Sequence, residues 1–175
     1  MTALLFTTGC SALAGLVCCQ IEIGGFENTR SGILLGVRGQ WMVQVDSPGI
    51  VDCDEFRPFW ISWADYVIEA GYGLYPSRST AFISWTDPDR AVNVTSLSVS
   101  TRTSMGEEAD GNWQFDLTDG NSFLMRTQTN TSQFSHSLVL LDVSFTFRVR
   151  ACDSVGFELL SVPGQLLLTA AIMQP

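Results

Sequence analysis

Residues 21–37 read IEIGGFENTRSGILLGV, and the order of residue types in this stretch decides the fold class. Apolar and acidic residues alternate over Ile21–Ile23, which gives an extended chain one apolar side and one polar side. Two glycines and the pair Glu27–Asn28 then supply turn residues, and the chain becomes apolar again over Ser31–Val37. The stretch therefore predicts a hairpin-like unit, in which a turn joins two β-strands.

The same signals recur along the chain at intervals of about ten residues. Val92–Thr101 alternates, and Phe59–Trp63 and Tyr66–Ala70 are two short β-rich runs around the break Ala64–Asp65. β-Branched and aromatic residues are frequent in these runs, and no segment has a convincing helical pattern. We expect an all-β fold, an antiparallel β-sandwich or a jelly-roll-like arrangement. The other segments with this pattern are Gln40–Val45, Thr80–Trp85, Trp113–Phe115 and Leu138–Val149.

The composition limits the classes of function. Apolar residues make up 46% of the 175 residues, which is enough for a packed core. The formal net charge is −9 and every basic residue is Arg, so the chain repels phosphate backbones and nucleic acid is a poor partner. No uninterrupted apolar run reaches the ~18 residues that mark a membrane span. The single His136 lies in a serine-rich stretch typical of a surface loop, not of a catalytic base.

The cysteines and two short motifs bear on the cellular compartment. No pair of CxxC motifs is present, so a structural zinc site is not expected. An odd number of cysteines leaves at least one thiol unpaired within the chain, and the pairing of the others stays open. Asn93 and Asn130 begin N-glycosylation motifs, which have meaning only in the secretory pathway. The five cysteines are Cys10, Cys18, Cys19, Cys53 and Cys152.

Three blocks in a fixed order carry a resemblance to a known family. They are Ile21–Ser31, then Arg57–Trp63 (RPFWISW), then Trp85–Asp89 (WTDPD). Together they resemble the farnesoic acid O-methyltransferase-type domain, a module of secreted and multidomain proteins, over roughly residues 9–115. That family often has Trp at the position of Phe26. This departure weakens any site that would use an indole there.

The resemblance implies a division of the chain. Residues 1–117 would form one domain, and the polar residues 118–137 would form a loop or linker. Residues 138–175 would be either the start of a second copy or strands that complete the first. The apolar residues 1–19 would begin inside the first strand of a copy, in preference to a signal peptide.

The family name implies methyl transfer from S-adenosylmethionine to farnesoic acid. A cofactor loop of that kind needs glycines between a strand and a helix, and only Glu69–Tyr75 (EAGYGLY) has similar spacing. Because this stretch lies within a β pattern, we interpret it as part of a hairpin. The acids of Asp87–Asp89 suit a turn better than a calcium site. We therefore expect no catalytic residue, no cofactor and no metal.

The tryptophans favour recognition instead, because indole faces stack on sugar rings while polar side chains bond the hydroxyls. Core packing is the commoner role for each indole taken singly, and Asn28 has an equal competing role in its own turn. We expect a non-catalytic recognition module of an extracellular or luminal protein that binds carbohydrate or a protein partner, with neighbouring domain copies. The alternatives are the methyltransferase and a purely structural repeat. The candidate ligand-binding residues are Asn28, Arg30, Trp60, Trp85 and Asp87.

Overall fold

The computed structural model describes residues 17–35, 40–89, 94, 96–101, 110–116, 122–128, 144–152 and 154–161. These residues form β-strands and one short turn, labelled α1. None of the helices in this part of the chain is long and apolar enough to cross a membrane. The elements are β1 (Val17–Gly24), α1 (Gly25–Asn28), β2 (Arg30–Leu35), β3 (Gln40–Asp46), β4 (Arg57–Ala64), β5 (Val67–Tyr72), β6 (Ala81–Thr86), β7 (Ser96–Thr101), β8 (Asp110–Asp116), β9 (Ser122–Gln128), β10 (Ser144–Ala151) and β11 (Val155–Ser161).

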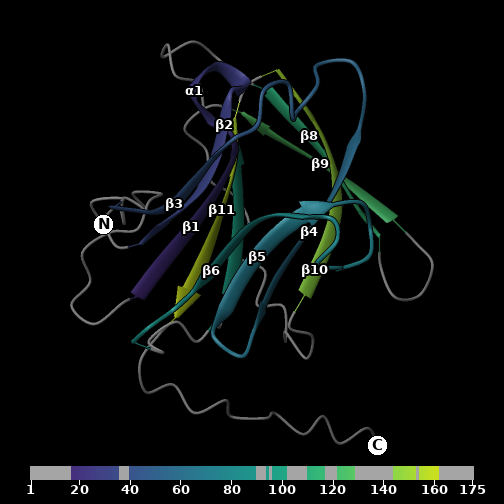
Figure 1. Ribbon diagram of the computed structural model, residues 1–175. Helices are drawn as coiled ribbons and strands as arrows, with labels where there is room; N and C mark the ends of the chain where they lie inside the picture. Colours follow the sequence, from purple (N-terminus) through teal and green to yellow (C-terminus); the bar gives the residue numbers. More distant parts are fainter. Residues whose placement is uncertain are drawn as a thin grey trace, which may run out of the picture.

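The strands form two antiparallel sheets that face one another (Figure 1). One sheet has the order β3-β2-β1-β11-β7, and the other has the order β6-β5-β4-β10-β8-β9. The expected antiparallel β-sandwich is confirmed. The hairpin predicted from residues 21–37 is present as β1 and β2, which pair with Ile21 opposite Ile33.

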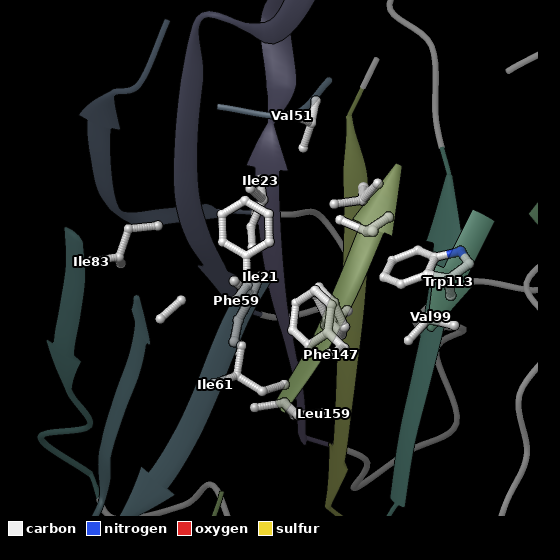
Figure 2. Packing of buried hydrophobic residues seen from close by; sticks show 14 of the residues in the cluster. Ile21, Ile23, Val51, Phe59, Ile61, Ile83, Val99, Trp113, Phe147 and Leu159 are labelled. Atoms are coloured by element: carbon white, nitrogen blue, oxygen red, sulfur yellow. The ribbon is translucent and has the colours of Figure 1, made fainter. Parts of the chain in front are cut away.

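The core lies between the sheets and follows the alternation of side chains along each strand. Figure 2 shows Phe59, Ile61 and Phe147 of one sheet facing Ile21 and Leu159 of the other, and all five are fully buried. The centre of the core is aromatic. The ring of Phe147 lies 4.5 Å from that of Phe157 in the opposite sheet, and the edge of Trp113 meets Phe157 at 5.4 Å between centroids.

Two strands from the C-terminal part of the chain lie in the interior of the sheets. β10 pairs with β4 on one side and with β8 on the other, with Phe147 between Phe59 and Phe115. β11 pairs with β1 and β7, with Phe157 between Ile21 and Val99. Residues 144–152 and 154–161 thus complete the sandwich that the N-terminal segment begins.

The prediction that residues 118–137 form a loop or linker is wrong for part of this segment. Ser122–Gln128 within it is strand β9, which pairs with β8 along its whole length. As an edge strand, β9 can present Leu124 to solvent and still bury Thr127 beneath Trp113, whose indole N–H donates to the Thr127 hydroxyl at 2.8 Å. A polar composition is compatible with such a strand, because only one of its sides must be buried.

Residues 47–56 carry the chain from β3 in one sheet to β4 in the other. Ile50 and Val51 of this crossover are buried, and the Asp52 carbonyl accepts the Ala151 amide at 2.8 Å. Next to this contact Cys53 forms a disulfide with Cys152, 99 residues later in the sequence. The bond ties the crossover to the end of β10.

The carboxylate of Asp52 organises the same crossover. It accepts the backbone amides of Asp54 and Glu55 at 2.8 Å and 3.1 Å, and the guanidinium of Arg57 at 2.9 Å. These donors favour the charged carboxylate and hold the pKa of Asp52 below its usual value, with the Asp54 amide contributing most.

Cys19 of β1 is a buried free thiol. Burial, with the carboxylate of Asp87 nearby, raises the pKa of Cys19 to about 12, so the thiol stays protonated and unreactive at neutral pH. Cys10 and His136 and the glycosylation motifs at Asn93 and Asn130 lie outside the described residues.

Removing the disulfide should destabilise the sandwich. Cys53→Ser, Cys152→Ser and the double variant should each lower the free energy of unfolding in urea by about 2–4 kcal/mol, because each frees a loop of 99 residues in the unfolded chain. The two single variants serve as controls for one another, since either removes the same bond. A double variant as stable as the wild type would contradict this role.

A second pair of variants tests how much the aromatic centre of the core contributes to the free energy of unfolding. Phe147→Ala should lower the free energy of unfolding by about 3–5 kcal/mol, because the cavity opens between both sheets. Leu124→Ala, at a side chain 74% exposed on β9, should change it by less than about 0.5 kcal/mol. Equal losses in the two variants would mean that Phe147 does not hold the sheets together.

Candidate functional site

The turn between β1 and β2 has an unusual backbone. Phe26, Glu27 and Asn28 have φ values of 53°, 59° and 59°, and Gly24 before them has a φ of 74°. A left-handed conformation costs a residue with a side chain roughly 1–2 kcal/mol, and three in succession are rare. Strain of this kind persists only where the surroundings impose it. Figure 1 shows the turn, labelled α1, at one end of the sandwich.

Asn28 fixes the turn to the crossover. Its side-chain amide donates to the Val51 carbonyl at 2.8 Å, and its side-chain oxygen accepts the Val51 amide at 3.1 Å. The backbone carbonyl of Asn28 also accepts the Gly49 amide at 2.8 Å. A side chain at residue 24 would clash here, because a Cβ would lie 2.9 Å from both the Asn28 oxygen and the Val51 side chain.

A second set of hydrogen bonds lies beneath the turn. The buried hydroxyl of Ser31 accepts the Gly24 amide at 3.1 Å and lies 2.6 Å from the hydroxyl of Ser47. The Ser47 amide donates to the Thr29 carbonyl at 2.8 Å, and the Thr29 hydroxyl donates to the Phe26 carbonyl at 2.6 Å. Because each group is held by another, the turn presents the side chain of Phe26 at a defined position.

A β-bulge in the pairing of β2 and β3 places Trp41 close to the turn, on the outer side of the sheet. By strict alternation Trp41 would face the core with Val43, but the pairing of β2 and β3 shifts register between Ile33 and Leu34. Ile33 lies opposite Val43 and Leu34 lies opposite Trp41, so the indole turns to the outer face of the sheet.

The indole then rests on Gly32, which is also on the outer face. A Cβ on residue 32 would lie 2.4 Å and 2.7 Å from two carbons of the six-membered ring of Trp41. Only glycine leaves room for this contact.

Four side chains form what we call the turn surface: Phe26, Arg30, Trp41 and Asp46. The rings of Phe26 and Trp41 lie 6.1 Å apart at an angle of 38°, and the Arg30 guanidinium lies 5.7 Å from the centre of the Phe26 ring. Arg30 also pairs with the Asp46 carboxylate at 3.6 Å. Phe26 is 51% exposed. The cluster combines aromatic faces with an exposed ion pair.

The five residues predicted from the sequence do not meet in one site. Arg30 belongs to the turn surface. Asn28 lies beneath this surface, where its side chain is hydrogen-bonded to the backbone of Val51. Trp85 is partly buried and packs against the core. Asp87 is 3% exposed, and its carboxylate accepts the Asp89 amide at 3.1 Å, as in the turn that Asp87–Asp89 predicts.

Trp60 is 1% exposed and lies on the other sheet, on the side opposite Phe59. Its indole N–H donates to the Thr80 hydroxyl at 3.1 Å, and its ring covers Gly71, where a Cβ would lie 2.3 Å from a ring carbon. The faces of this indole are therefore not available for stacking on a ligand.

Sequence reasoning missed Phe26 and Trp41. In the sequence, Phe26 fits the aromatic position of the family pattern, where Trp is frequent, and Trp41 belongs to an ordinary alternating strand. The available signal was Gly32, a glycine inside the predicted strand Ser31–Val37, which marks a bulge or a close approach.

The stretch Glu69–Tyr75 does not fit S-adenosylmethionine. Gly71 lies inside β5 beneath the indole of Trp60, so its backbone is not open to a cofactor. β5 continues antiparallel to β6, and the next described element is that strand, not a helix. Among the described residues, no group of three His, Cys, Asp or Glu side chains is placed to hold a metal ion.

Comparison with known proteins gives a family but no individual relative. No curated protein and no solved structure matches the chain. A family model described as farnesoic acid O-methyl transferase matches residues 11–118, which span β1 to β8. Strands β10 and β11, which complete both sheets, follow the matched region. The match covers more than half of the residues of the chain, and the chain therefore belongs to the farnesoic acid O-methyltransferase family.

Proposed function

We propose that the chain is a non-catalytic recognition module that binds its ligand at the turn surface. The observation that carries this proposal is the exposed ring of Phe26, held on a left-handed backbone between Trp41 and Arg30. Aromatic side chains give large contact areas at a low cost in conformational entropy, and Trp, Tyr and Arg are enriched among the residues that dominate binding energy. A surface of this kind suits a carbohydrate or a protein partner.

The alternative is a methyltransferase that acts on farnesoic acid, as the family name suggests. Recognition is favoured over it because Gly71 of the glycine-containing stretch lies under the indole of Trp60. Among the described residues, three of the five non-glycine residues with positive φ also lie in the turn that carries this surface. Backbone strain tends to collect at sites where ligands bind.

We also propose an extracellular or secretory location. The support is the disulfide between Cys53 and Cys152, because such bonds persist in oxidising compartments and are rare in the cytosol. The glycosylation motifs at Asn93 and Asn130 agree with this location.

Titration with S-adenosylmethionine separates the two functions. Isothermal titration calorimetry of the folded chain should give no heat of binding, because Gly71 does not present its backbone to the cofactor. Far-UV circular dichroism of the same sample controls for folding. Saturable heat with S-adenosylmethionine would overturn the recognition proposal in favour of the enzyme.

Substitutions of Asn28 and Arg30 should distinguish a residue that stabilises the turn from one that lies on the turn surface. Asn28→Ala removes both hydrogen bonds to the Val51 backbone and should lower the free energy of unfolding by about 1–3 kcal/mol. Arg30→Ala removes a solvent-exposed pair with Asp46 and should change it by less than about 1 kcal/mol. Urea unfolding measures both. A larger loss in Arg30→Ala would assign Arg30 to the scaffold instead of the ligand.

A further inference from the structure

We propose that the turn surface binds an uncharged pyranose ring, with the outward-facing, half-buried indole of Trp41 as the stacking platform beside the exposed ring of Phe26. This inference rests on the proposed recognition function and names the class of ligand. It follows from three observations: the orientation of the indole, the polar groups at its border and the charge around it.

The orientation comes from Gly32. The six-membered ring of Trp41 lies against this glycine on the outer face of the sheet, and the pairing of Leu34 with Trp41 keeps it there. Two carbons of the six-membered ring occupy the space that a Cβ on residue 32 would need, and the ring of Phe26 lies 6.1 Å from the indole between centroids. Because the indole is held in place on the outer side of the sheet and is only partly buried, it can offer ring surface to a flat apolar group. The C–H face of a pyranose provides such a group.

The polar groups come from the neighbouring positions of β2 and β3. Arg30 lies opposite Asp46, and Gly32 lies opposite Gln44, whose side chain is exposed. Arg30 and Asp46 are 52% and 89% exposed, so both can bond a ligand without losing a buried partner. Guanidinium, carboxylate and amide groups together donate to and accept from hydroxyls. A ring with several hydroxyls on its rim and C–H groups on its face matches this set.

The charges on the chain and at the turn surface favour a neutral sugar as the ligand. The chain has a net charge of −9, and the positive charge of Arg30 is balanced by Asp46 within the surface. A sialic acid or a sulfated sugar would meet a negative field without an unmatched cation among these residues.

A glycan array probed with the folded chain tests the inference, followed by calorimetric titration with the methyl glycoside of the best neutral hexose. Binding should be weaker by about tenfold or more in Trp41→Ala. Gly32→Ala should lose binding similarly, because the new methyl group displaces the indole. Leu124→Ala, on the other sheet, should bind as the wild type does. Far-UV circular dichroism and urea unfolding confirm that each variant is folded. If Trp41→Ala does not fold, Trp41→Phe, which retains a smaller ring, should bind more weakly.

Three results would overturn the inference. They are the absence of binding to any neutral glycan, a preference for sialylated or sulfated glycans, and neutral-glycan binding that is unchanged in both Gly32→Ala and the Trp41 variant. If the chain bound a protein partner in a way that requires Phe26 and bound no glycan, a pyranose ligand would be ruled out and the recognition function would stand. Binding of S-adenosylmethionine, in contrast, would overturn the recognition function itself.

Discussion

The contact between Phe147 and Phe157 is the constraint on which the sandwich depends. The two rings belong to β10 and β11, which are adjacent in the sequence but lie in opposite sheets, and their centres are only 4.5 Å apart. Each strand also joins two groups of strands within its own sheet. β10 connects β4 to β8, and β11 connects β1 to β7. One pair of strands therefore closes both sheets and supplies the centre of the core between them.

This arrangement extends to the candidate site through the crossover at residues 47–56. One end of that segment is tied to β10 by the disulfide of Cys53 and Cys152 and by the Asp52 carbonyl. The residue next to this tie, Val51, is held by the side-chain amide of Asn28. The left-handed turn thus rests on a segment that is itself held by the C-terminal strands. The free energy that packing supplies in the core maintains a backbone conformation that the turn would not adopt in isolation.

The family name and the fold lead to different expectations of function. The name describes a methyl transfer, whereas the described residues form two antiparallel sheets, and the glycine-containing stretch Glu69–Tyr75 begins within β5 beneath Trp60. A fold does not determine a function, which depends on the side chains at a site. The proposed recognition function assigns that site to Phe26, Arg30 and Trp41, which lie together at the turn surface.

The sequence by itself determined the β-sandwich, because alternation in segments such as Ile21–Ile23 and Phe59–Trp63 is a local property that directly reflects one buried side of a strand. It also predicted Arg30 in the candidate surface, since polar residues after a glycine turn lie at the end of a sheet. Only the tertiary structure decided which indole lies on the outer side of the sheet beside Phe26. The bulge that turns Trp41 outward depends on the register of two strands, and Trp60 is buried by Thr80 and Gly71, which are distant in the sequence. The role of Asn28 was likewise decided by Val51, a partner 23 residues away that no local pattern identifies.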